Sequence, residues 1–362
     1  ALRIAVTPQI RRLRRLFYCG EWISSHALHV VMLHAPDYLG FESAIEMARS
    51  YRDEVQRGLR MRSQANQLLE ALGGRAVHPI NVAVGGFYAA PSEADLRRLI
   101  PEFEWGLEAA VDTTRWVSTF NFPRLDCDLP LVALTHPDEY PMNEGTLACS
   151  DGPAFAIEQF EDAFTERQCD YSTALQAVRT SDRSAYVVGP AARLSLNAER
   201  LRPTARELLH EIDLTLPLRN PYEMILARCL EMTNAYEEAL EILRGDLSCT
   251  PARVPYRPRS GRGVAATEAP RGVLYHRYEI DPAGRIATAR IVPPTSQSQA
   301  AIEETLRVRA AQTATWSDAA IAGECEKLVR CYDPCISCAT HELRVDVNRR
   351  DASPQTELHR VL

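Results

Sequence analysis

A change of hydrophobic period near residue 272 constrains the fold of this chain more than any other feature. Residues 272–280 and 285–292 alternate between apolar and polar side chains and flank Asp281-Pro282-Ala283-Gly284, a strong turn signal, so they predict a β-hairpin. Apolar residues recur at helical spacing in seven other segments: 8–33, 41–72, 92–120, 203–212, 221–244, 300–310 and 317–330. We therefore expect a mainly α protein with small β-hairpins and sheets, of the α+β class.

Composition narrows the class of protein. The 362 residues include 46% apolar and 25% charged side chains, as in a globular protein, and the net charge of −7 argues against a nucleic-acid partner. No apolar run is long enough for a membrane span, and the first residues lack a signal-peptide pattern, so we expect a cytoplasmic location. Glycine-rich nucleotide-binding motifs are absent. Residues 246–263, with three prolines, predict a linker.

Two of the ten cysteines, Cys335 and Cys338, form the one C-x-x-C pair and directly follow a predicted helix. A turn at this spacing lets both sulfurs face one ion, and thiolates suit zinc, nickel, iron or copper(I). His341 could bind the same ion or a second one. The pair alone is equally consistent with a redox disulfide, half a zinc site or two core cysteines, so it does not decide between them.

The predicted hairpin brings Arg271 and Thr295 to the same end, because one residue precedes its first strand and the other follows its second. A guanidinium and a hydroxyl at this place could donate hydrogen bonds to an anionic ligand. Taken singly, such loop residues more often have structural roles, in tight turns, helix ends and ion pairs.

Six short motifs follow one another along the chain: Ser25-His26-Ala27-Leu28-His29, Gly73-Gly74-Arg75-Ala76-Val77-His78-Pro79, Gly189-Pro190-Ala191-Ala192-Arg193, Glu268-Ala269-Pro270-Arg271-Gly272, Pro293-Pro294-Thr295 and Asp333-Pro334-Cys335-Ile336-Ser337-Cys338-Ala339-Thr340-His341. Together, and in this order, they resemble the large (alpha) subunits of nickel–iron hydrogenases, in particular the cytoplasmic NADP-linked or sulfhydrogenase-type branch. The resemblance implies the large-subunit fold with a helix-bundle core. It also implies one domain over residues 1–341 and a C-terminal tail, 342–362, that is cleaved on maturation or kept as part of the fold.

The resemblance further implies a centre of nickel and of iron with carbon monoxide and cyanide ligands. Cys335 would be a terminal nickel ligand and Cys338 would bridge the two metals, while His341 would bind a magnesium-type ion. The expected catalytic group is Arg271, Cys335 and Asp333. The residues assigned to cyanide binding and to the surroundings of the centre are Pro293, Pro294, Thr295, His26 and His78.

The implied function is reversible heterolytic cleavage of H2 to protons and electrons. Since the chain has no cysteine set for a cluster, the electrons would pass to an iron–sulfur small subunit, with a flavin/NAD(P) diaphorase module and a maturation protease as further partners. The family's first cysteine pair, in an Arg-x-Cys-Gly-x-Cys segment, has no counterpart in these residues, so we expect an N-terminally incomplete chain that is inactive alone. The alternative is a degenerate hydrogenase-like scaffold without a complete metal centre that binds an iron–sulfur partner; a zinc or disulfide module is the third reading.

Overall fold

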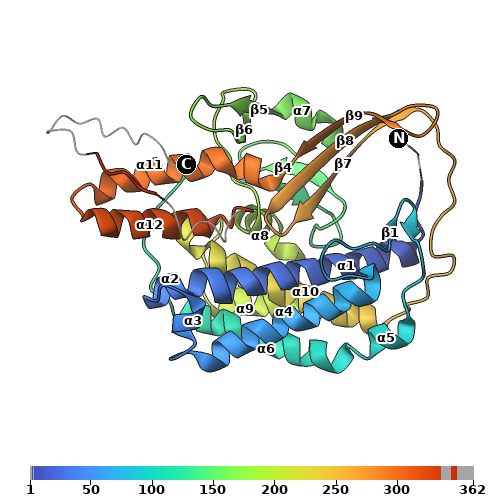
Figure 1. The fold of residues 1–362 in the computed structure, drawn as a ribbon, viewed down its shortest axis with the longest axis horizontal. Helices are drawn as coiled ribbons and strands as arrows, with labels where there is room; N and C mark the ends of the chain where they lie inside the picture. The colour runs from blue at the N-terminus through green and yellow to red at the C-terminus, as the bar shows by residue number, and fades with distance from the viewer. Residues whose placement is uncertain (1, 3, 336–343, 349–362) are drawn as a thin grey trace.

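A layer of long helices forms the base of the molecule in the computed structural model, which describes residues 2, 4–335 and 344–348 (Figure 1). Cys338, His341 and the predicted tail beyond residue 348 therefore lie outside the described residues. The layer contains α1 (Pro8–Ala27), α4 (Arg52–Gly73), α6 (Ile100–Ser118) and α10 (Met224–Arg244). Helix α1 packs against both α4 and α10, and α10 also packs against α6.

Local sequence signals explain where these helices begin and end. The Thr7 side chain accepts a hydrogen bond from the Ile10 amide and Pro8 opens α1, while α4 ends at Gly74, which has a left-handed φ of +77°. The helix predicted over 92–120 is divided by a break between α5 (Glu93–Arg97) and α6. Pro101 itself lies in the first turn of α6, where the absence of an amide hydrogen has little cost.

The segment after α1 departs from the predicted helix. A π-helix, η1 (Leu28–His34), continues α1 and leads into α2 (Ala35–Leu39). Such segments are rare and occur most often at functional sites. Hydrophobic period alone does not distinguish a π-helix from an α-helix, so the π-helix could not be predicted from the sequence.

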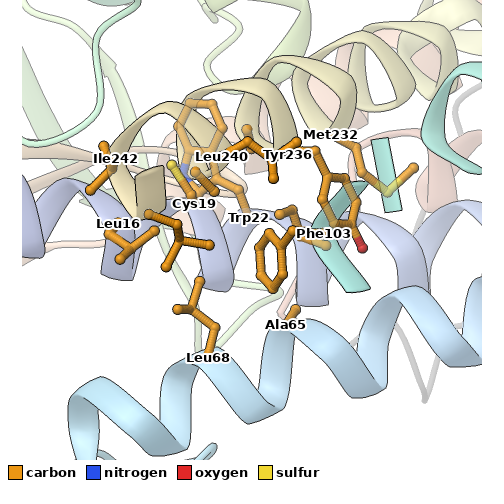
Figure 2. Packing of buried hydrophobic residues seen from close by; sticks show 14 of the residues in the cluster. Leu16, Cys19, Trp22, Ala65, Leu68, Phe103, Met232, Tyr236, Leu240 and Ile242 are labelled. Atoms are coloured by element: carbon orange, nitrogen blue, oxygen red, sulfur yellow. The ribbon is translucent and has the colours of Figure 1, made fainter. Parts of the chain in front are cut away.

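The largest hydrophobic core lies between the helices of this layer. Trp22 of α1, Leu68 of α4, Phe103 of α6 and Tyr236 of α10 all contribute to this core (Figure 2), and the side chains of all four are fully buried. The rings of Phe103 and Tyr236 meet edge to face, with their centroids 5.3 Å apart. Burying a side chain of this size contributes about 1.5–3 kcal/mol.

A three-stranded antiparallel sheet lies above the helical layer (Figure 1). The predicted hairpin is confirmed as β8 (Gly272–Ile280) and β9 (Ile286–Val292). A further strand, β7 (Gly261–Ala269), pairs with β8 along its whole length. The predicted linker at 246–263 is therefore wrong for its last three residues, because backbone pairing with β8 outweighs their weak strand propensity.

Two helices follow the sheet, α11 (Pro294–Thr313) and α12 (Asp318–Cys331), and they pack against each other. The remaining elements are short: α3 (Ala44–Met47), β1 (Val82–Ala83), β2 (Gly86–Phe87), β3 (Val132–Thr135), β4 (Thr146–Cys149), η2 (Ile157–Gln159), α7 (Phe160–Ala163), β5 (Phe164–Gln168), β6 (Leu175–Arg179), α8 (Pro190–Asn197), η3 (Ala198–Arg200), α9 (Pro203–Glu211) and η4 (Pro221–Glu223). The predicted mainly helical class with small antiparallel sheets is confirmed. Among the described residues, none of the helices combines the length and the apolar character that a membrane crossing requires.

Candidate metal centre

Arg271 and Asp333 meet where the sheet approaches the end of α12. Arg271 occupies the turn between β7 and β8, and its Nε donates to the backbone oxygen of Asp333 at 2.7 Å while Nη2 lies 3.1 Å from Oδ1. Asp333 is 1% exposed and has a φ of +47°, a left-handed conformation that aspartate tolerates better than most residues. This conformation ends the helix and turns the chain towards Pro334, as expected for a proline just past a helix end.

Cys335 follows directly and contacts the start of α11. Its backbone amide donates to Oγ1 of Thr295 at 3.2 Å, and the residue is exposed. Pro293 is the N-cap of α11 and the buried Pro294 begins the helix, so the two prolines fix the position of Thr295. Two hydrogen-bonded pairs, Arg271 with Asp333 and Thr295 with Cys335, are thus linked through the short backbone segment 333–335.

Two glycines allow the Arg271 turn to pack closely on the segment before α8. Gly189 has a φ of +96°, and a Cβ there would lie 2.7 Å from the backbone oxygen of Arg271. Gly272 has a φ of +132°, and a Cβ there would lie 2.6 Å from Cγ2 of Val188. Both contacts are closer than real Cβ atoms allow, so a side chain at either position would displace Arg271.

Four ionisable side chains without solvent exposure form what we call the buried charge cluster: His26, Arg193, Glu231 and Glu268. Arg193 Nε and Nη2 donate to the two carboxylate oxygens of Glu231, each at 2.7 Å, and Nη1 donates to Glu268 at 3.0 Å. Arg193 also donates to the backbone oxygens of Ala269 and Pro270. The cluster therefore fixes the backbone directly before Arg271.

The two carboxyl groups bound to Arg193 have pKa values shifted in opposite directions. Burial raises the pKa of Glu268 to about 7, although the charge of Arg193 opposes this shift. Burial also acts to raise the pKa of Glu231, but the two-fold hydrogen-bonded ion pair with Arg193 and the contact with His26 outweigh it and lower the pKa to about 2. One carboxyl group therefore has a pKa near neutrality, while its neighbour stays ionised. Such a difference in pKa allows one group to act as an acid and the other as a base.

Three further residues lie next to this cluster, and no role was predicted for them from the sequence: Arg228, His29 and His34. His29 and His34 stand five residues apart on the π-helix, with ring centroids 5.1 Å apart, and burial lowers the pKa of both. Arg228 is 1% exposed, and its Nε and Nη1 have no hydrogen-bond partner among the residues the structure describes. The sequence does contain one signal: Arg228 and Glu231 are the charged residues in the mainly apolar segment 224–236, and their spacing of three places them on one helix face.

The two predicted histidines occupy different surroundings. His26 is fully buried, and its Nε2 lies 3.0 Å from Oε2 of Glu231. His78 lies in the exposed loop after α4 with a φ of +54°, and no hydrogen bond joins it to Arg271, Asp333 or Cys335 among the described residues. Within these residues, no group of three or more His, Cys, Asp or Glu side chains is placed to hold a metal ion.

Comparison with known proteins finds one matching family model and several relatives of this chain. A family model described as nickel-dependent hydrogenase matches residues 171–341. Sulfhydrogenase 1 subunit alpha of Pyrococcus furiosus is 30% identical over 345 residues, which cover 93% of this chain and 79% of that relative. Subunit beta of the NAD-reducing hydrogenase HoxS of Cupriavidus necator is 26% identical, with 94% of this chain and 78% of the relative covered.

A solved structure agrees with this result at the level of the fold. The NAD+-reducing NiFe hydrogenase crystallised in its H2-reduced state matches with a TM-score of 0.83 and 22% identity. The match covers 93% of this chain and 81% of that one. At this identity the likeness shows the fold alone.

Proposed function

We propose a metal centre for this chain, which belongs to the nickel-dependent hydrogenase family and is a nickel–iron hydrogenase large subunit. In this proposal Cys335, with Arg271, Asp333 and Thr295 around it, forms part of the centre at which H2 is cleaved. The observation that carries this proposal is that Arg271 binds Asp333 and that Thr295 binds Cys335. These residues come from the sheet, from α11 and from the segment at the end of α12. A surface loop held only by its own turn would not require three separate elements to meet.

The residue types fit a nickel–iron centre. When bound, the two metals supply the heterolytic cleavage of H2. Cys335 offers a soft thiolate ligand for nickel, with Cys338 as the second ligand of this motif. Its amide is held by Thr295, and the Arg271 guanidinium supplies a fixed positive charge beside it. The buried Arg228 guanidinium, whose Nε and Nη1 have no hydrogen-bond partner within the described part of the chain, also matches a centre rich in negative charge.

Finer details of the centre belong to the same proposal. Iron would carry carbon monoxide and cyanide, with Pro293, Pro294 and Thr295 at the start of α11 as the cyanide-binding segment. Helix N-termini favour negatively charged ligands, which supports this assignment. His341 would bind a magnesium-type ion. His26 supports the centre through Glu231 and Arg193, and His78 is assigned to its wider surroundings.

An iron–sulfur small subunit is the partner we propose for electron transfer. The loop around β1 and β2 exposes large apolar side chains, which favour a protein contact; they are Val77, Ile80, Val82, Val84 and Tyr88. A flavin/NAD(P) diaphorase module and NADP-linked activity are proposed because one relative is named an NAD-reducing hydrogenase. A maturation protease acting after His341, a domain spanning residues 1–341 and a cytoplasmic location complete the proposal.

Metal analysis and hydrogen-dependent dye reduction of the mature complex, co-expressed with the full-length large subunit, test this function together. We expect nickel and iron in the purified complex and reduction of the dye only under H2. Cys335→Ser should remove most of the nickel and the activity, whereas the matched change Cys169→Ser, in the loop between β5 and β6, should affect neither. A mature complex that contains neither metal would overturn the proposal.

The comparisons do not favour the scaffold alternative, because the matched relatives are hydrogenase subunits. The third reading, a zinc or disulfide module, differs in a measurable way. It predicts that Cys335 binds zinc or no metal, and that dye reduction does not depend on H2.

A further inference from the structure

Arg228 is an unusual residue of this fold because its charge is buried without being neutralised by a direct contact. It lies on α10, is 1% exposed, and has neither an ion pair nor a hydrogen bond from Nε or Nη1 among the described residues. Burial without a partner lowers its pKa. A charged group in such a place is strongly unfavourable unless an acceptor is supplied.

The other fully or nearly fully buried arginines show how this chain normally satisfies such groups. Arg193 binds Glu231, Glu268 and two backbone oxygens. Arg15, which is 4% exposed, binds Glu238, Glu139 and the backbone oxygen of Tyr140. Arg330, which is 3% exposed, binds Asp37. Among the buried arginines that the structure describes, Arg228 therefore differs in lacking such contacts from Nε and Nη1.

The nearest acidic residue on its own helix cannot complete Arg228. Glu231 lies three residues further along the same face of α10, but its Oε1 already accepts from Arg193 and Tyr140. Its Oε2 accepts from Arg193 and contacts His26. The hydrogen-bonding capacity of this carboxylate is thus in use, and the acceptor for Arg228 has to come from elsewhere.

The charged groups around Arg228 locate it at the candidate metal centre. The acidic side chains Asp333 and Glu231 act to raise the pKa of its guanidinium, whereas the positive charge of Arg271 acts to lower it. Asp333 and Arg271 are the pair that holds the Cys335 segment in place. The unfilled donors therefore lie on the α10 side of the same site.

We propose that Arg228 is a further binding residue of the nickel–iron centre, whose Nε and Nη1 donate to an anionic acceptor carried by that centre. The acceptor chemistry is that of a metal-bound thiolate sulfur or of an anion bound to iron. A charge-assisted hydrogen bond of this kind is about twice as strong as a neutral one and would fix the orientation of the centre. This inference rests on the function proposed above, since it requires the metals to be present.

The test compares Arg228→Met and Arg228→Lys with Arg15→Lys in the co-expressed complex. Arg228→Met has similar length but no donor, and we expect it to retain nickel and iron about 10- to 100-fold less well in a chelator challenge, as for the loss of other residues that orient metal ligands. Arg228→Lys keeps the charge and should recover part of the metal. Arg15→Lys alters an equally secluded arginine outside the site and should retain both metals fully.

Spectroscopy of the metal-loaded Arg228→Lys complex identifies the acceptor, and this variant remains informative if Arg228→Met does not fold. A shift of the infrared cyanide bands would support an anion bound to iron. Unshifted cyanide bands with an altered nickel X-ray absorption edge would support a thiolate. Full metal retention with both spectra unchanged would overturn the proposal and leave Arg228 a structural residue. Absence of both metals from the wild-type complex would instead overturn the proposed function, and this inference with it.

Discussion

Arg271 binds Asp333 through two contacts of different character: Nε donates to the backbone oxygen at 2.7 Å and Nη2 lies 3.1 Å from the side-chain Oδ1. The first contact does not depend on the charge of the Asp333 side chain, and the second does. Changes at the two residues are therefore not equivalent, although they form one ion pair.

Arg271→Met should lower hydrogen-dependent dye reduction more than Asp333→Asn does. Arg271→Met removes the positive charge and both contacts, and we expect a loss of about 100- to 1000-fold, as for removal of a preorganised electrostatic group. Asp333→Asn keeps the backbone acceptor and an uncharged oxygen. Arg277→Met, which breaks the ion pair of β8 with Glu161 away from the site, serves as the control and should retain activity. Equal losses in the two site variants would contradict this prediction.

Gly189→Ala should reduce both thermal stability and dye reduction. The new Cβ would meet the backbone oxygen of Arg271 at 2.7 Å, in a backbone conformation that alanine rarely adopts, so the Arg271 turn has to move. Gly152→Ala is the matched control, because nothing lies within 4 Å of the Cβ it would add. The measurements are the thermal midpoint and the turnover rate of the purified complex; an unaffected Gly189→Ala would show that the turn can shift freely.

Thr295→Val should weaken the position of Cys335 without altering the volume of the side chain. The change removes the acceptor for the Cys335 amide, whereas Thr295→Ser retains it. We therefore expect Thr295→Val, and not Thr295→Ser, to lower nickel content. Equal nickel contents in the two variants, measured by metal analysis, would show that this hydrogen bond does not support the site.

Glu231→Gln should be among the most destabilising single changes in this chain. It leaves the fully buried Arg193 with an incomplete set of negative partners, which costs about 3–5 kcal/mol for a buried pair. Glu211→Gln, at the exposed ion pair with Arg115, should leave the thermal midpoint unchanged. If both variants unfold at the same temperature as the wild type, the buried charge cluster does not stabilise the fold.

The two carboxyl groups of the cluster should give opposite pH dependences. The pKa of Glu268 is about 7 in the folded chain against 4.5 for a free glutamate, so between these values unfolding releases a proton. Stability from this group therefore falls as the pH rises from 4.5 to 7 and stays low above that. Replacing it in Glu268→Gln should raise the thermal midpoint relative to wild type more at about pH 8 than at about pH 5.

Glu231 behaves in the reverse sense because its folded pKa is lowered to about 2. Its contribution is fully present above pH 4.5 and is lost as the pH falls towards 2. The difference in thermal midpoint between wild type and Glu231→Gln should therefore shrink on acidification. A difference that grows in acid would reverse the assignment of the two carboxyl groups.

The parts of the structure that the sequence predicted are those encoded locally. Alternating polarity and a turn signal predicted β8 and β9, and the hairpin then placed Arg271 and Thr295 at one end. Helix α12 begins at Asp318, one residue after its predicted start, and Ser317 is its N-cap. The predicted linker wrongly included the first three residues of strand β7, and the rest of that strand was not predicted, because its formation depends on pairing with β8, which its own residues do not specify.

The buried charge cluster could not be predicted for a related reason. Arg193 and Glu231 lie on different helices, and an arginine in a helical segment is equally compatible with a solvent-exposed face. Only the packing of α8 against α10 decides that both are buried. The same holds for Arg228, whose lack of partners becomes visible only once every neighbour is in place.

Strand β8 also separates the candidate metal centre from a surface position to which a label could be attached. Nine residues of extended strand lie between Arg271 and the turn at Asp281-Pro282-Ala283-Gly284, which corresponds to roughly 27–30 Å. Ala283 is exposed at this far tip. A dye or an electrode linker joined there through Ala283→Cys would hold the molecule in a known orientation while the metal centre stays untouched.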